Sequence, residues 1–139
     1  ILQYLPMRAI KQEDKLGCGI ACVAFILKIK YEDTRDLFAD GKRRANEEAN
    51  FYCREIVRIL ESRTLSCEYK YLKKRLKHKI YRPNTIVFIK KSEKYPFGHY
   101  LCRSKVGWMD PWINFPNEYR KVGFRKRLPE KPIYIIHQT

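Results

Sequence analysis

The 139-residue sequence predicts a single α+β domain in which N-terminal helices pack on a C-terminal antiparallel β-sheet. Helical patterns occupy the first half of the chain, whereas β-branched and apolar runs occupy the second half. No repeat or linker divides residues 1–139. A hydrophobic fraction of 45% indicates a folded core rather than a disordered chain.

Three helices are predicted in the first half of the chain, over residues 20–27, 31–38 and 51–62. The first is apolar on every side, as expected of a helix that is buried in the core. Residues 42–50, which follow Asp40-Gly41, predict a polar loop. Residues 2–10 predict an extended segment, because Pro6 would break a helix.

Strands are predicted at residues 67–72, 85–89, 99–102, 106–109 and 132–137. The third and fourth are expected to pair as an antiparallel hairpin that turns at residues 103–105. Because the helices come first and do not alternate with the strands, the pattern favours an antiparallel sheet over a parallel one.

The net charge of +15 is concentrated in the second half of the chain. Residues 69–139 hold 18 Lys and Arg against 4 Asp and Glu, whereas residues 1–68 hold 12 against 11. A charge of this size usually has an acidic counterpart, such as RNA, an acidic immunity or inhibitor protein, an acidic peptide, or an anionic membrane. The residues expected to bind substrate or a polyanion are Lys73, Lys74, Arg75, Lys77, Arg125, Lys126 and Arg127.

The five cysteines lack the even, paired spacing of a disulfide framework, so we expect free thiols in a reducing, cytoplasmic compartment. Cys18 and Cys22 are close in sequence, but no second pair completes a zinc site, and no metal or cofactor is expected.

No apolar run approaches the roughly 20 residues of a membrane span. The chain begins with Ile, which favours a fragment of a longer polypeptide, for example a secreted protein delivered into a target cell.

Four residues have the types and the order that thiol catalysis requires: Gln12, Cys18, His99 and Asp110. Cys18 lies in Gly-Cys-Gly just before the apolar helix, and the partial positive charge of a helix N-terminus favours a thiolate there. Cys22 falls one turn inside the helix, where a thiol is normally inert.

The base and its partner are expected to meet on the predicted hairpin. His99 opens one strand and Asp110 closes the next, so the carboxylate can accept one ring N–H and leave the other nitrogen to Cys18. Gln12, six positions before Cys18, can offer its amide to a developing oxyanion.

At these residues the sequence resembles the papain-like cysteine peptidase domain of bacteriocin-processing ABC transporters. The resemblance spans Gln12 to Asp110 and includes Cys-Gly-Ile-Ala-Cys, the His on a strand, and Asp-Pro. It implies a papain-like fold with Cys18 as nucleophile, His99 as base, Asp110 as orienting carboxylate and Gln12 as oxyanion donor. The family usually has Asp directly before the Cys, whereas this chain has Gly17 there.

The resemblance implies a peptidase that cuts a peptide or protein after small residues. Papain-like domains of this kind also occur in polymorphic toxins, which leaves a toxin domain that binds and cleaves RNA as an alternative. There the basic half would bind phosphates, and five aromatic residues could stack on bases: Tyr69, Tyr71, Tyr81, Trp108 and Trp112. A non-catalytic binding module is the third hypothesis, which the complete set of four residues speaks against.

Overall fold

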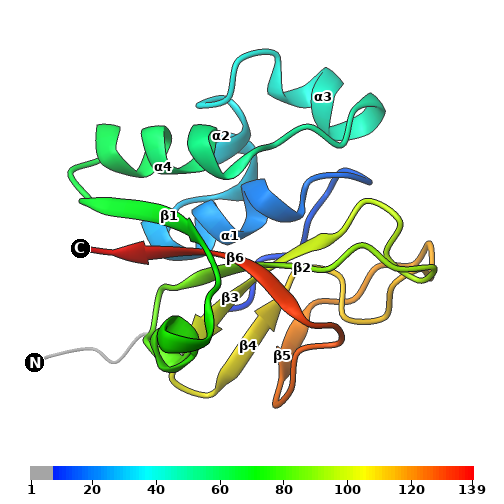
Figure 1. The fold of residues 1–139 in the computed structure, drawn as a ribbon. Coiled ribbons are helices and arrows are strands. Elements are labelled where there is room, and N and C mark those ends of the chain that lie inside the picture. The colour runs from blue at the N-terminus through cyan, green and yellow to red at the C-terminus, as the bar shows by residue number, and fades with distance from the viewer. Residues whose placement is uncertain (1–7) are drawn as a thin grey trace, which may run out of the picture.

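The computed structural model describes residues 8–139, and it shows four helices on one side of a six-stranded antiparallel sheet (Figure 1). The helices are α1 (Cys18–Leu27), α2 (Tyr31–Arg35), α3 (Gly41–Glu47) and α4 (Cys53–Ser62). The predicted α+β class with helices preceding the sheet is therefore confirmed. Of the extended segment predicted over residues 2–10, the part up to residue 7 lies outside the described residues.

The sheet has the strand order β1-β6-β2-β3-β4-β5. Its strands are β1 (Cys67–Tyr71), β2 (Ile86–Ile89), β3 (His99–Ser104), β4 (Gly107–Asp110), β5 (Gly123–Arg125) and β6 (Pro132–Gln138). The five predicted strands are present, and β3 and β4 pair as the expected hairpin. Its turn falls at residues 105–106 and not at 103–105, because Arg103 and Ser104 still pair with β4. The short β5 and a 3-10 helix, η1 (Lys74–Tyr81), were not predicted, since neither has a clear apolar periodicity.

The prediction of a polar loop over residues 42–50 was wrong, because α3 occupies most of it. This helix is polar at nearly every position, and contacts outside it hold it in place. The Arg44 guanidinium makes hydrogen bonds of 2.9 and 2.6 Å to both carboxylate oxygens of Glu55 in α4. Ala45 is fully buried in the core. The predicted helix over 31–38 is shorter than expected and ends at Arg35.

The sheet separates two apolar clusters. On the helical side, α1 and α4 pack on residues of β2, β3, β4 and β6 that include Ile86, Tyr100 and Met109. On the opposite side, alternate residues of the same strands, among them Leu101 and Trp108, pack with Ile80 of η1. Figure 1 shows η1 on this second side, away from the four helices.

All five cysteines are free, as expected from their number and spacing. Within residues 8–139, no helix has the length and apolar character that a membrane crossing demands.

Candidate active site

Cys18 is the first residue of α1 and is partly exposed at the edge of a cleft. N–H groups in the first turn of a helix have no acceptor within the helix, and they give the helix start a partial positive charge. The backbone N–H of Tyr100 in β3 lies 3.4 Å from Cys18 Sγ and donates to it. The Cys18 sulfur atom therefore lies where the start of α1 meets β3.

The close approach of α1 to β3 depends on the glycine that follows Cys18. A Cβ atom at Gly19 would lie 3.2 Å from the Tyr100 ring and 3.3 Å from the Ile56 side chain, which is tighter than ordinary packing. The Gly-Cys-Gly sequence therefore allows the helix start to press against the strand that carries the base.

Gly17 has no room for a side chain either, because the Tyr31 hydroxyl occupies the place where its Cβ would be. That hydroxyl donates a 2.8 Å hydrogen bond to the buried carboxylate of Asp14, which also accepts from Arg35 at 2.9 Å and Asn46 at 3.0 Å. The carboxylate near the start of α1 is therefore that of Asp14. Position 17, directly before the cysteine, has no space for the Asp side chain that the resembled family usually has there.

His99, the first residue of β3, contacts Asp110, the last residue of β4. His99 Nε2 lies 2.7 Å from Asp110 Oδ1, and both side chains are almost completely buried. With Nε2 bound to the carboxylate, Nδ1 is the ring nitrogen that remains for the thiol. Burial lowers the pKa of His99, but the neighbouring Cys18 and Asp110 outweigh it and raise that pKa to about 9.

Asp110 is held by three donors. Its Oδ1 also accepts the backbone N–H of Trp112 at 3.0 Å, and its Oδ2 accepts from Arg125 Nη1 at 3.1 Å. Burial raises the pKa of the carboxyl, but the bonds from His99, Trp112 and Arg125 lower it more, so the net direction is downward. Asp110 is thereby ionised and fixed in orientation.

Aromatic rings enclose His99. The Tyr95 ring stacks on the imidazole with 5.3 Å between centroids. The Phe115 ring stacks on Tyr95 at 5.0 Å and lies 6.4 Å from the imidazole. Gly98, directly before His99, has φ of +73°, and a Cβ there would collide with the Phe88 ring. The chain can therefore enter β3 beside Phe88 only through glycine.

Gln12 lines the same cleft as Cys18 and is 1% exposed. Its Nε2 donates to the backbone carbonyls of Asp14 at 3.1 Å and Lys15 at 3.0 Å. Its Oε1 is buried without a partner among the described residues. In this arrangement the amide secures the turn before α1, and an oxyanion role requires one of these N–H bonds to be exchanged for a bond to substrate.

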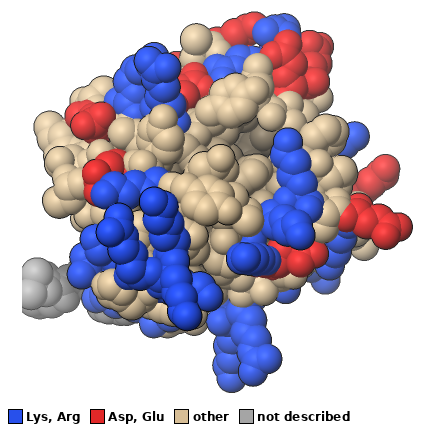
Figure 2. Space-filling view, in the orientation of Figure 1, with Lys and Arg blue, Asp and Glu red and all other residues tan. Residues whose placement is uncertain are grey.

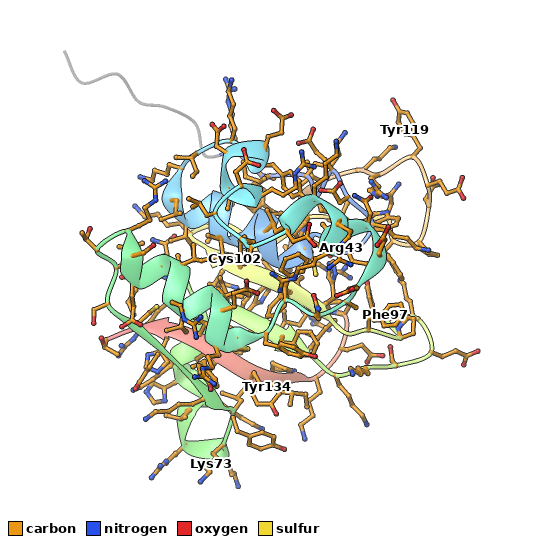
Figure 3. All side chains as sticks on the ribbon, turned by 90° about the horizontal axis from the view of Figure 1, so that it is seen from above. Arg43, Lys73, Phe97, Cys102, Tyr119 and Tyr134 are labelled. Atoms are coloured by element: carbon orange, nitrogen blue, oxygen red, sulfur yellow. The ribbon has the colours of Figure 1, made fainter. Side chains whose placement is uncertain are left out.

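The cleft over Cys18 and His99 is narrow, and several aromatic rings line it. Its free space is about 60 Å³. It is also lined by Phe51 and Phe97, which come from two separate parts of the chain. Figure 3 shows Phe97 on the loop between β2 and β3, at one side of the molecule. Within residues 8–139, no three His, Cys, Asp or Glu side chains are grouped to hold a metal ion.

Of the seven predicted polyanion-binding residues, Arg125 has a different role from the others. Arg125 donates a hydrogen bond to Asp110, so it belongs to the hydrogen-bond network of His99 and Asp110. Its position in a basic run of the sequence did not indicate this role. Lys77, Lys126 and Arg127 line a second cavity. Lys73 lies far from Phe97, which lines the cleft over Cys18, as Figure 3 shows. Of the aromatic residues proposed for stacking, Trp108 and Trp112 are buried, whereas Tyr69, Tyr71 and Tyr81 are exposed.

No protein-family model and no curated protein matches this sequence. Among solved structures, the chain is similar to the peptidase domain of Streptococcus ComA, a bi-functional ABC transporter involved in a quorum-sensing pathway. The two share 16% sequence identity with a TM-score of 0.62, over 96% of this chain and 98% of the ComA domain.

The fold is that of a papain-like peptidase domain. This agrees with the fold implied by the sequence resemblance. In this chain the start of α1 lies against β3, and that junction brings Cys18 beside Tyr100 and His99.

Proposed function

We propose that this chain is a cysteine peptidase that uses Cys18, His99 and Asp110. The observation that carries the proposal is the 2.7 Å contact from Asp110 to His99 Nε2, in a cleft that Cys18 also lines. This contact leaves His99 Nδ1 for the thiol and holds the carboxylate in the orienting position. The similarity to the ComA peptidase domain supports the same activity.

The arrangement accounts for each step of peptide hydrolysis. Cys18 Sγ attacks the carbonyl carbon, and the resulting oxyanion accepts bonds from the N–H groups at the start of α1 and from the Gln12 amide. His99 then gives its proton to the leaving amine, and an acyl-thioester remains on Cys18. A water molecule that transfers a proton to His99 attacks the thioester and releases the acid product. Asp110 keeps the ring oriented and stabilises its charged form throughout.

The narrow cleft favours a substrate with small residues next to the scissile bond. The free space beside Cys18 is about 60 Å³ and is bounded by aromatic rings such as Phe51 and Phe97. We infer that the substrate is an extended peptide or a flexible segment of a protein. Processing of a bacteriocin-type leader is one such reaction, and cleavage of a host protein after delivery as a toxin is another.

Cleavage of RNA by the same site is the second candidate. It requires acid–base groups around a ribose 2′-hydroxyl, and it would give Cys18 no role as a nucleophile. His99 is 4% exposed, stacks on Tyr95 and is bound to Asp110. An imidazole held in this way suits transfer of a proton to and from a neighbouring thiol, so the geometry favours the peptidase.

The test compares wild type with Cys18→Ala, using Cys22→Ala as the matched control, because Cys22 is a fully buried thiol one turn along the same helix. Each protein is incubated under reducing conditions with a proteome-derived peptide library, and new N-termini are identified by mass spectrometry. We expect cleavage by wild type and Cys22→Ala, and none by Cys18→Ala. Cleavage that persists in Cys18→Ala, or cleavage of added RNA in place of peptide, would contradict the proposal.

A further inference from the structure

A second cavity lies on the side of the sheet opposite the four helices. It has a volume of about 310 Å³, which is at the lower end of the roughly 300–1,000 Å³ typical of ligand pockets. Its walls come from η1, from β4, and from the segment between β5 and β6. It shares no lining residue with the cleft over Cys18.

The rim of this cavity is cationic. Lys77 of η1 lies on one wall, and Lys126, Arg127 and Lys131 lie on the other. All four are exposed, and no acidic residue lines the cavity. None of the four is in an ion pair with a carboxylate within residues 8–139, where the paired cations are others.

The floor is apolar and aromatic. Ile80 and Trp108 are buried beneath the cavity, and Tyr81 at its edge is 60% exposed. The guanidinium of Arg103 lies 5.3 Å from the ring centroids of both Tyr81 and Trp108. This cation fixes the Tyr81 ring at the mouth of the cavity, with part of the ring open to solvent.

The cationic surface continues along η1 beyond the cavity. Lys73, Lys74 and Arg75 at the start of this helix are exposed, and no acid occurs between Lys70 and Arg82. Figure 2 shows Lys and Arg side chains gathered over the region where Figure 1 places η1. A ligand that used both the cavity and this row would therefore be an extended polyanion.

We propose that this cavity and the adjoining row on η1 bind a single-stranded polynucleotide. One base stacks on Tyr81 over the apolar floor, while Lys77, Lys126, Arg127 and Lys131 contact the phosphates on either side. The neighbouring phosphates follow the exposed cations of η1. A double strand is excluded because its bases are already stacked and do not present a free face to Tyr81.

Two other anionic partners fit less well. An acidic peptide would use the cations, but its carboxylates have no planar ring to place on Tyr81. An anionic membrane would require apolar side chains that protrude, whereas the apolar residues here form the floor of a hollow. The proposal does not rest on the peptidase activity, since the two cavities are separate.

The test measures binding of a short fluorescein-labelled oligouridylate to the full chain by fluorescence anisotropy over a range of salt concentrations. The charge variant is Lys126→Glu/Arg127→Glu. The matched control is Lys28→Glu/Lys42→Glu, which makes the same change in net charge at exposed lysines near α1 and α3. We expect the first pair to weaken binding by about tenfold or more and to reduce the salt dependence, and the control to change it by less than about twofold.

A second pair of variants tests the stacking. Tyr81→Ala should weaken binding by about tenfold, whereas Tyr81→Phe should stay within about twofold, since every base can stack on either ring. Cys18→Ala should bind like wild type, which separates this proposal from the peptidase. Absence of binding by wild type would overturn the proposal. So would equal competition by oligoglutamate or by phosphatidylglycerol vesicles, or an effect of the charge variant without any effect of Tyr81→Ala.

Discussion

Asp110 contacts His99 through a 2.7 Å bond from Oδ1 to Nε2, although the two residues are not direct cross-strand partners. The register pairs Cys102 with Met109, so the main chain of Asp110 lies closer to the middle of β3 than to its first residue. The carboxylate reaches diagonally across the hairpin to the ring. His99 is the first residue of β3, and it lines the same cleft as Cys18.

Cys18 should be the most reactive of the five thiols. Burial raises the pKa of Cys22, Cys53 and Cys102, and it raises that of Cys67 to about 11, so these thiols are poor nucleophiles at neutral pH. Brief treatment of the folded protein with iodoacetamide, followed by peptide mapping, should find Cys18 labelled first. Cys53 is the internal control, because it is also partly exposed. Equal labelling of the two thiols would show that Cys18 is not activated.

The stability of the protein should fall at alkaline pH because of His99. Its pKa of about 9 lies above the ordinary value of 6.5, so the folded state holds this proton more tightly than the unfolded state does. The resulting stabilisation is complete below pH 6.5 and is lost as the pH rises through about 9, with a size on the order of 1–3 kcal/mol.

Urea unfolding of wild type and His99→Gln at several pH values measures this effect. The difference between the two proteins in free energy of unfolding should shrink as the pH rises. His78→Gln is the control, since His78 is exposed on η1, and it should show no such trend. A difference that is constant with pH would mean that His99 is not protonated at neutral pH.

Arg125 should act as a positioning residue for Asp110. Its guanidinium lies 3.1 Å from Asp110 Oδ2 and helps to hold the pKa of that carboxyl low. We expect Arg125→Gln to reduce kcat/KM by about tenfold, which corresponds to one lost charge-assisted hydrogen bond of roughly 1.5 kcal/mol. The acidic limb of the pH–rate profile should move to higher pH, because Asp110 becomes easier to protonate.

Arg125→Lys, which keeps the positive charge, should restore much of the activity. Arg82→Gln, at an exposed arginine just after η1, controls for the loss of one charge and should leave the profile in place. If Arg125→Gln lowers activity equally at every pH, the residue supports the fold of this region and does not tune Asp110.

Gln12 has two possible roles, to donate a hydrogen bond to the oxyanion or to stabilise the turn before α1. Comparison of peptide cleavage with alkylation of Cys18 distinguishes them. Loss of an oxyanion donor typically lowers kcat by about 10²–10³-fold, but alkylation by iodoacetamide forms no oxyanion. If Gln12 stabilises the oxyanion, Gln12→Ala should lower peptide cleavage by that amount and leave the alkylation rate of Cys18 nearly unchanged. If both rates fall together, its bonds to the carbonyls of Asp14 and Lys15 are its main contribution.

Gly17 and Tyr31 should be energetically coupled. A side chain at position 17 meets the Tyr31 hydroxyl, so Gly17→Ala should destabilise the protein by about 1–3 kcal/mol. In a Tyr31→Phe background the hydroxyl is absent, and the cost of Gly17→Ala should be clearly smaller. Thermal or urea unfolding of the four proteins of this double-mutant cycle measures the coupling. Additive effects would show that the loop before α1 moves aside freely.

The fold class and most elements could be predicted because they depend on residues that are close in sequence. The apolar run after Cys18 indicates α1 from its local sequence, and the glycines on either side of Cys18 mark its start. His99 and Asp110 could be placed at the ends of paired strands, because a short hairpin fixes its own register.

The polar helix α3 was missed because distant contacts stabilise it. Its sequence shows no apolar face, and the bond from Arg44 to Glu55 of α4 does not show in the local pattern. The role of Arg125 was misassigned for a related reason. In the sequence it belongs to a basic run, and only the pairing of β5 with β4 brings it to Asp110.

The sequence by itself determined which residues could do thiol chemistry, in what order they occur, and that helices would precede an antiparallel sheet. The tertiary structure decided which of these groups meet: His99 with Asp110, Arg125 with the same carboxylate, and Lys77 with Lys126 around a second cavity. The physical reason is that helix and strand formation respond mainly to neighbouring residues. A site, in contrast, requires contacts between segments far apart in the chain, and the packing of the whole core sets those contacts.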